Sequence, residues 1–497
     1  MSANAKKKMS MSALILMIFT SVYGFNNMPR AFYIMGYGSI PFYIISALLF
    51  FIPFAFMIAE YGAAFKDEKG GIFSWMEICM GTKYAFIGTF MWYASYVVWL
   101  INISSGIMIP VSNAIFGTDK TGTWSLFGLS SIQTLGVIGV VFISVVTFFA
   151  SKGISAVQKV AKVGGIACMA INVLLYVGAI AVLVGNGLHL LQPLPSTMKE
   201  LFSAQHPAYQ GTIGMFAFLV FALFAYGGTE AVGGLVDETE NPEKNFGKGL
   251  TIAAIIVAIG YSLGIFCVGI FTNWTEVLGD AETVTLGNAS YVIMNNLGVQ
   301  IGKAFGASAG TCTALGNGVA RFMGLSIVCS LSGALFTLIY SPLKQMIEGA
   351  PEGLLPKKFA IITDGVPKNA MYMQCALVAI MDLLIAFGGD TAAKFFQILT
   401  NMTNVAMTLP YMFIAGAFIN FKKNDSIQKP FLIYKSKGMA VAFTWLILIV
   451  IGFANVFTII QPAVGGDIAT TVWSVLGPVL FSLAAWILAT RYEKNKA

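Results

Sequence analysis

Long apolar runs separated by short polar segments dominate the sequence from start to end. A run of about 20 mostly apolar residues is long enough to cross a bilayer as a helix. The runs predict an all-α polytopic membrane protein with twelve transmembrane helices. The segment 272–317 is a long polar excursion with room for short helices. The predicted spans are residues 10–35, 40–61, 84–110, 130–150, 156–184, 211–235, 247–271, 318–346, 370–388, 393–420, 438–460 and 470–490.

The first apolar run imitates a secretory signal peptide, because Lys6, Lys7 and Lys8 precede it. Such a peptide ends in a small-x-small cleavage pattern. Here the run is followed by the segment from Phe25 to Pro29, which contains no such pattern. We therefore predict that the run is retained as the first helix.

Two of the predicted spans are interrupted in the same way. Tyr23-Gly24 lies near the middle of the first span, and Tyr226-Gly227 lies near the middle of the sixth. Because five spans separate the two places, the second copy would cross the bilayer in the opposite direction. Paired interruptions at corresponding places in two halves point to the central binding site of a transporter. The alternative is that the glycines merely allow close helix packing.

A helix break exposes main-chain groups that lipid cannot satisfy. The second half of a broken helix begins with free N–H groups, and the first half ends with free C=O groups. Each unsatisfied group in hydrocarbon costs several kcal/mol, so both sets must face protein or a cavity. Free N–H groups suit a carboxylate, and carbonyls suit an ammonium group. Such a site is compatible with an amino acid zwitterion.

Composition and charge agree with the membrane class. Of the 497 residues, 57% are hydrophobic and 10% are charged, whereas about a quarter are charged in a soluble domain. The net charge is +7, but the basic residues lie in short loops without interleaved aromatic residues, so no nucleic acid partner is expected. The N-terminal side of the spans carries 23 Lys and Arg residues and the other side six. This asymmetry places both termini in the cytoplasm and the protein in the cytoplasmic (inner) membrane.

The spacing of the cysteine and histidine residues does not match a disulfide framework or a metal site. The six cysteines show no CxxC spacing, and His189 and His206 lie in one polar loop. We therefore expect no disulfide framework, no metal site and no bound cofactor. A membrane enzyme would need a constellation of nucleophile or metal ligands, so no catalytic residue is assigned. A channel agrees less well with two inverted breaks than alternating access does.

Several stretches resemble the amino acid–polyamine–organocation superfamily of transporters over essentially the whole chain. Residues 224–230 (FAYGGTE) and 238–242 (ETENP) are similar to its aromatic-Gly-x-Glu and Glu-x-x-Asn-Pro signature. Residues 59–62 (AEYG) and 69–75 (KGGIFSW) resemble its acidic residue and Gly-Gly-x-x-x-Trp loop. Residues 353–367 resemble the loop after its eighth span. The stretch from Glu60 to Trp75 resembles most the glutamate/GABA antiporter branch of this superfamily.

The resemblance implies a LeuT-like fold in a single transmembrane domain, residues 1–497. Two inverted five-helix repeats, roughly residues 10–184 and 211–420, would contain the broken helices 1 and 6. Two further helices, 438–490, would follow. Members of the superfamily exchange amino acids or polyamines, or couple them to protons, by alternating access. The implied function is therefore secondary active transport of an amino acid.

The resemblance also implies where the substrate lies. Its carboxylate would face the first break and its amine the carbonyls of the second. Phe224 matches an aromatic gate, and Trp99, Phe336 and Asn401 match positions that select the substrate side chain. The expected substrate-binding residues are Val22, Tyr23, Gly24, Phe25, Trp99, Phe224, Ala225, Tyr226, Gly227, Phe336 and Asn401. The first break departs from the Gly-Ser-Gly that many members have, because Val22 and Tyr23 precede its single glycine.

Three ionisable residues inside predicted spans require a reason, because a charge at a helix centre costs roughly 2.5–3.5 kcal/mol. Glu230 is either a structural acceptor for freed N–H groups or, as the resemblance implies, a gating or proton-coupling residue. Arg30 either reaches the outer interface with its long stem or attracts acidic substrates. Asp382 is expected to hydrogen-bond neighbouring helices and is not assigned to a site.

Several alternatives stay open at this point. A polyamine or cationic amino acid transporter is the second interpretation, and a non-transporting membrane sensor on the same scaffold is a remote one. The expected partners are a small amino acid or amine and the lipid bilayer. The participation of protons, the dependence on sodium and the oligomeric state are not determined by the sequence.

Overall fold

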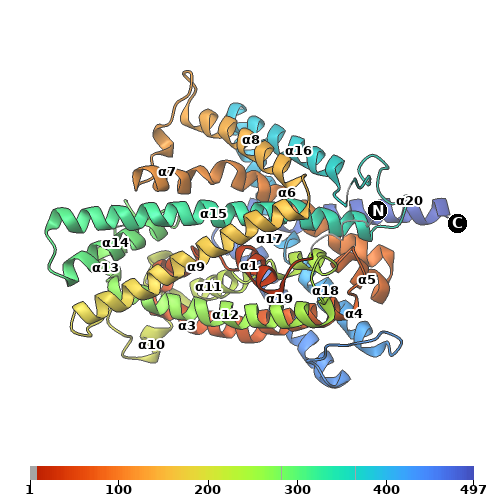
Figure 1. Ribbon diagram of the computed structural model, residues 1–497, viewed down its shortest axis with the longest axis horizontal. Helices are drawn as coiled ribbons and strands as arrows, with labels where there is room; N and C mark the ends of the chain where they lie inside the picture. The colour runs from red at the N-terminus through yellow and green to blue at the C-terminus, as the bar shows by residue number, and fades with distance from the viewer. Residues whose placement is uncertain (1–7, 281, 364, 497) are drawn as a thin grey trace, which may run out of the picture.

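The long helices of the chain lie side by side along one axis (Figure 1). The computed structural model describes residues 8–280, 282–363 and 365–496. Among these residues only isolated β-bridges occur and no strand, so the prediction of an all-α membrane protein is confirmed. Eleven helical stretches in this part of the chain are long and apolar enough to cross a membrane.

The helices of the first predicted repeat follow the expected spans closely. They are α1 (Met11–Val22), α2 (Asn27–Met35), α3 (Ser39–Ser46), α4 (Ile52–Ala64), α5 (Ile72–Met80), α6 (Thr82–Gly106), α7 (Met108–Phe116), α8 (Ser131–Ala150) and α9 (Ile154–Gly185). A π-helical turn, Ala47–Phe51, joins α3 to α4. The short helix α10 (Met198–Leu201) lies in the loop after α9.

The second predicted repeat and the appended pair follow in the same order. The helices are α11 (Gly211–Phe224), the 3₁₀ helix η5 (Thr229–Leu235), α12 (Pro242–Phe271), α13 (Trp274–Leu278), α14 (Ala289–Ala304), α15 (Ala309–Gly349), α16 (Lys368–Phe387), α17 (Gly389–Ala406), α18 (Leu409–Lys423), α19 (Lys437–Val464) and α20 (Ile468–Lys496). Helices α13 and α14 occupy the polar excursion in which short helices were expected. The boundaries of the two repeats themselves stay a prediction.

The difference between twelve expected spans and eleven long stretches arises at the first span. The break leaves α1 only 12 residues long, and α2 continues through the following helices as one apolar stretch, Asn27–Ala64. Pro29, in the first turn of α2, explains where this second half begins. A proline has no N–H to donate to the preceding turn, so it is tolerated at a helix start and not in its interior.

Two glycines produce the break in the sixth span. α11 ends at Phe224, and η5 begins at Thr229 after Gly227 and Gly228. Gly228 has φ +108°, a region that residues with a side chain rarely adopt. A Cβ atom at Gly228 would also lie 2.5 Å from the carbonyl oxygen of Ser21 in α1. The two broken helices therefore touch at a point where only glycine fits.

The tenth span, expected to be continuous over 393–420, is also interrupted. α17 ends at Ala406 and α18 begins at Leu409. Pro410 stands in the first turn of α18, where its missing N–H does no harm. The same proline would remove a main-chain hydrogen bond from an unbroken helix, so the helix stops before it.

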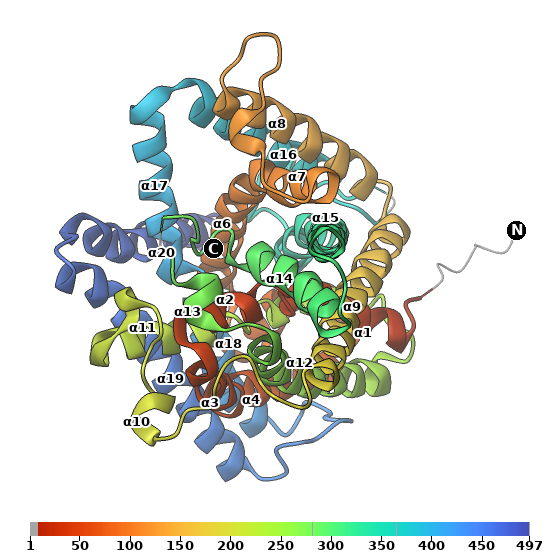
Figure 2. The same cartoon turned by 90° about the vertical axis from the view of Figure 1, so that its left-hand side faces the viewer.

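The two halves of the first broken helix lie at different depths in the bundle. Figure 2 shows α2 near the centre and α1 to the right of it, beside α9. α1 packs against α9, α12 and α15. In Figure 1, α20 ends at the right-hand end of the bundle, where α5 also lies, while α10, α13 and α14 lie at the left-hand end. We call these the terminal end and the opposite end.

Buried ion pairs hold the terminal end together. The Nζ atom of Lys344, near the end of α15, lies 2.7 Å from Asp237 Oδ1 and 3.8 Å from Glu238 Oε1. Lys422 of α18 lies 2.8 Å from Glu60 Oε2 of α4, and both side chains are at most 5% exposed. These pairs join the loop after η5 to α15, and α4 to α18. The terminal end is therefore tied across several helices.

The segment before α1 is bound to the same end through its main chain. Met9 forms an isolated parallel bridge with Thr239. Its N–H donates to the carbonyl of Glu238 at 2.7 Å, and its carbonyl accepts from the N–H of Glu240 at 2.9 Å. The side chain of Met9 is 1% exposed. The start of the first span thus lies beside the loop that follows η5.

Candidate functional site

A cavity of about 440 Å³ lies between the two helix breaks, and we call it the central cavity. Its lining comes from α1, α2, α6, α11, α15, α17 and α18 together with both breaks. The lining residues are Ser21, Val22, Gly24, Asn27, Ser95, Tyr96, Trp99, Asn102, Phe224, Ala225, Gly227, Gly228, Leu331, Ala334, Leu338, Thr400, Thr403, Asn404, Met407, Thr408 and Tyr411. A volume of this size falls within the range typical of small-molecule sites.

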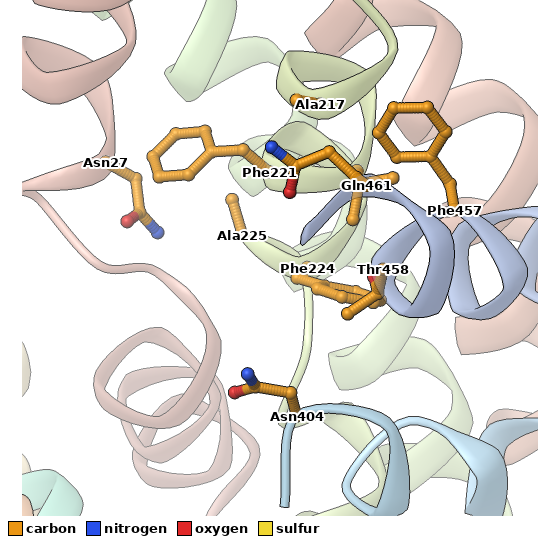
Figure 3. A pocket seen from close by; sticks show the side chains of 10 residues that line it. Asn27, Ala217, Phe221, Phe224, Ala225, Asn404, Phe457, Thr458 and Gln461 are labelled. Atoms are coloured by element: carbon orange, nitrogen blue, oxygen red, sulfur yellow. The ribbon is translucent and has the colours of Figure 1, made fainter. Parts of the chain in front are cut away.

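A second cavity of about 430 Å³ adjoins the first, and we call it the outer cavity (Figure 3). Asn27, Phe224, Ala225 and Asn404 line both cavities. The remaining lining residues belong to α11 and α19 and are Ala217, Val220, Phe221, Phe457, Thr458 and Gln461. Because α11 runs from the opposite end to the second break, the outer cavity lies between the break and the opposite end.

One hydroxyl group joins the two breaks. Tyr261 of α12 accepts hydrogen bonds from the Gly24 N–H at 2.9 Å and from Asn27 Nδ2 at 3.2 Å. Its own proton can go to the carbonyl of Val22, at 3.2 Å, or of Ala225, at 3.1 Å. The end of α1, the start of α2 and the end of α11 are thus held at one point.

Other main-chain groups at the first break remain free. Within the described part of the chain, the N–H groups of Phe25 and Asn26 make no hydrogen bond. They precede α2, whose first turn carries the positive end of the helix dipole. Gly24, beside them, is exposed and lines the central cavity. Phe25 and Asn26 themselves do not line the cavity, so their free N–H groups lie beside it.

Glu230 lies behind the wall of the central cavity on the side of the terminal end and is 0% exposed. Its Oε1 accepts from Trp92 Nε1 at 2.9 Å and from the Tyr96 hydroxyl at 3.1 Å, and the Tyr411 hydroxyl lies 3.5 Å away. Its Oε2 accepts the N–H of Gly228 at 3.2 Å. Glu230 is therefore an acceptor for a main-chain group that the second break frees. This contact supports the structural interpretation, while its gating or coupling role stays a prediction.

The structure brings part of the expected substrate-binding set together. The residues of that set that line the central cavity are Val22, Gly24, Trp99, Phe224, Ala225 and Gly227. Tyr23 and Tyr226 point away from it, because the Tyr23 hydroxyl donates to Asn172 Oδ1 at 3.0 Å and the Tyr226 hydroxyl to the Tyr43 carbonyl at 3.2 Å. These two tyrosines buttress the breaks from behind.

The remaining expected residues do not belong to the lining. Phe25 and Phe336 are buried among other helices, 2% and 6% exposed. On α15 the cavity is reached by Leu331, Ala334 and Leu338, which share a helix face that Phe336 does not. Asn401 turns to α20, where its Nδ2 donates to Thr470 Oγ1 at 3.0 Å.

The two other ionisable residues lie outside both cavities. The Arg30 Nε donates to the carbonyl of Leu286 at 3.1 Å, in the loop between α13 and α14. Asp382, on α16, is 4% exposed, and its Oδ2 has no hydrogen-bond partner among the described residues. The structure gives no physical account of this unpaired oxygen.

Sequence reasoning did not single out several residues of the site, chiefly Tyr261, Asn102, Asn404 and Tyr411. Asn404 belongs to a conspicuous polar row in the tenth span, residues 400–404, so a signal was present there. Tyr261 lies among other apolar and aromatic residues of α12 and had no such signal. No cluster of three or more His, Cys, Asp or Glu residues suited to a metal ion occurs in the described ranges.

Comparison with known proteins gives a consistent result. A family model described as amino acid permease matches residues 9–486. The sequence is 49% identical over 488 residues to the inner membrane transporter YjeM of Escherichia coli K12, covering 98% of this chain and 96% of that protein. It is 26% identical over 448 residues to the aspartate/glutamate permease AcaP of Lactococcus lactis subsp. cremoris, covering 89% and 86%. It is 22% identical over 398 residues to a glutamate/gamma-aminobutyrate antiporter of Lactococcus lactis subsp. lactis, covering 78% and 71%.

Proposed function

Because this chain belongs to the amino acid permease family, we propose that it is a secondary active transporter that carries an amino acid across the cytoplasmic membrane. The family is one of permeases, so the chain is a transporter and not an enzyme. The substrate is held in the central cavity between the two breaks. Transport proceeds by antiport or proton coupling, with alternating access to the two sides of the membrane.

The observation that carries this proposal is the chemistry of the two breaks. The free N–H groups of Phe25 and Asn26 and the exposed Gly24 offer a place for the substrate carboxylate. Ala225 and Gly227, at the end of α11, line the same cavity and can offer carbonyls to the substrate ammonium. A helix start and a helix end on one cavity match the two charges of a zwitterion.

The two ends of the bundle differ in a way that supports alternating access. Toward the terminal end, Glu230 with Trp92, Tyr96 and Tyr411 underlies the central cavity, and the Lys344 and Lys422 ion pairs lie beyond it. Toward the opposite end, the outer cavity continues from Phe224. We propose that both termini are cytoplasmic, as the charge asymmetry predicts, so that this conformation receives substrate from outside the cell.

The second interpretation, a polyamine or cationic amino acid transporter, receives less support from the cavity. A second ammonium group would need a carboxylate. Among the described residues, no Asp or Glu lines either cavity. Both oxygens of Glu230 already accept hydrogen bonds.

Counterflow into liposomes tests the proposal. The purified protein is reconstituted with a high internal concentration of one unlabelled amino acid, and uptake of the radiolabelled amino acid is measured at pH 7. We expect saturable exchange of at least one amino acid. Absence of exchange across all amino acids, with correctly reconstituted protein, would overturn the transport function and favour a sensor.

The role of Glu230 is tested with Glu230→Gln, and Asp382→Asn serves as the matched control because its carboxylate lies outside both cavities. If Glu230 couples proton movement to transport, Glu230→Gln keeps exchange but loses net uptake driven by a pH gradient. The control keeps both. Unchanged pH-driven uptake in Glu230→Gln would leave Glu230 with its structural role alone.

A further inference from the structure

Two asparagine side chains face the cavities without a partner in the protein. Asn102, on α6, and Asn404, on α17, are exposed although both lie in membrane-spanning helices. Within the described part of the chain, neither side chain makes a hydrogen bond. Both line the central cavity, and Asn404 also lines the outer one (Figure 3). An amide without a partner costs roughly 1–3 kcal/mol when it is buried dry, so these two must meet water or a ligand.

The lining around them carries no full charge. Among the described residues, no Lys, Arg, His, Asp or Glu lines either cavity. Arg30 is directed to the carbonyl of Leu286, and Glu230 is enclosed by donors behind Tyr96 and Tyr411. The free main-chain N–H and C=O groups at the two breaks can compensate the carboxylate and the ammonium group that every amino acid has. Nothing in the lining compensates a third charge on the substrate side chain.

The polar groups that do line the cavity both donate and accept. Besides Asn102 and Asn404, they include the hydroxyl of Ser21, which is buried and has no hydrogen-bond partner. A carboxamide offers an acceptor oxygen and two donor hydrogens, so it can pair reciprocally with another carboxamide. A carboxylate has acceptors only and an ammonium has donors only. A neutral group of both kinds therefore matches this lining best.

We propose that the substrate is an amino acid with an uncharged, polar side chain, of which a carboxamide is the best match, bound between Asn102 and Asn404. This inference rests on the proposed transport function and narrows it to one substrate class. The proposed substrate class differs from the acidic amino acids that appear in the names of two relatives of this chain. The hydrogen-bonding pair decides selectivity, because a site built for such bonds rejects an analogue that cannot make them.

Competition in the counterflow assay tests the substrate class with nearly isosteric probes. Glutamine and glutamate differ only in the terminal amide and carboxylate, and leucine supplies an apolar side chain of similar size. At pH 7 we expect glutamine to inhibit exchange at a concentration at least tenfold lower than glutamate, lysine or leucine. A lower inhibitory concentration for glutamate, lysine or leucine would overturn the inference while leaving transport intact. Failure of every amino acid to exchange would instead overturn the transport function itself.

Variants test the two asparagines directly. Asn102→Leu and Asn404→Leu remove the amide and nearly keep the volume, so we expect each to raise the half-saturating glutamine concentration about tenfold and to reduce the preference for glutamine over leucine. Asn317→Leu is the matched control, because Asn317 bonds Asn295 between α14 and α15 and lines neither cavity. Thermal unfolding verifies that each variant is folded. An unchanged preference in both folded variants would contradict the assignment of these residues.

Should a leucine variant fail to fold, Asn404→Asp provides the second test. It keeps the size of the side chain and leaves the exposed position polar, but places a carboxylate in the lining. We expect weaker inhibition by glutamate and stronger inhibition by lysine than in the wild type. If glutamate and lysine each inhibit the wild type and Asn404→Asp equally, Asn404 does not contact the substrate side chain.

Discussion

Removal of a single oxygen atom, in Tyr261→Phe, should loosen both helix breaks at once. The hydroxyl has two acceptor sites and one proton, so it can make three of its four hydrogen bonds at a time. A neutral hydrogen bond contributes about 1 kcal/mol net, which gives about 3 kcal/mol for three. Water from the cavity can replace part of this contribution, because all four partner residues line the cavity. We therefore expect a loss of about 1–2 kcal/mol.

The loss should be visible in both stability and transport. In detergent, we expect the thermal midpoint of Tyr261→Phe to fall by a few degrees. In liposomes, the half-saturating substrate concentration should rise about tenfold, because a free-energy loss of 1.4 kcal/mol in a preorganised site corresponds to a factor of ten. The maximal exchange rate should change less.

Tyr176→Phe is the matched control for this experiment. Tyr176 lies on the neighbouring helix α9, and its hydroxyl donates to the Gly260 carbonyl at 3.2 Å and to neither break. Its removal should cost about 1 kcal/mol or less and leave half-saturation unchanged. If Tyr261→Phe unfolds and exchanges as the wild type does, or if Tyr176→Phe is equally damaging, the hydroxyl does not hold the two breaks together.

Two further substitutions probe the fold around the site. Gly228→Ala should unfold several degrees lower than the wild type and lose exchange, because the φ of +108° and the 2.5 Å approach to the Ser21 carbonyl oxygen exclude a Cβ atom. Gly438→Ala is the control and should behave as the wild type, since a Cβ atom there would meet no heavy atom within 4 Å. Equal thermal midpoints for the two variants would refute this reasoning. Lys344→Met should cost about 3 kcal/mol, because it leaves Asp237 without its buried partner. Adding Asp237→Asn should restore part of that loss, and no recovery in the double variant would argue against the ion pair.

The sequence was sufficient to predict the long helices and the two helix breaks. Apolar length predicted the eleven long apolar stretches of the described residues, and Tyr-Gly pairs marked both breaks, because a break inside an apolar run leaves a local mark in the sequence. The third interruption, before Pro410, was not predicted, because the span 393–420 was assigned from its apolar length alone. Here the proline was the stronger signal.

The helix on which a site residue lies was easier to predict than the face of that helix to which its side chain belongs. Trp99 and Phe224 line the cavity as expected, whereas Phe336 and Asn401 belong to the expected helices but to other faces. A shift of one or two positions moves a residue by 100° to 200° around a helix, so an alignment by motif alone cannot fix its face. Tyr261 could not be foreseen, because its role depends on a contact between helices far apart in the sequence.

The bridge between Met9 and Thr239 has a consequence for how the protein tolerates sequence change. Its two hydrogen bonds use only main-chain atoms, so nearly any residue at these positions can form them, and proline alone among the twenty removes a donor outright. Replacing one side chain therefore leaves the two hydrogen bonds in place and affects this joint only through packing, since Met9 is buried. The bridge binds the start of the first broken helix to the loop that leaves the second, so the two half-helices on the terminal end would have to move away together or part at this joint. Substitutions in the side chains around it can therefore weaken or strengthen the ion pairs of the terminal end. The main-chain link between the first broken helix and the loop after η5 persists through such changes.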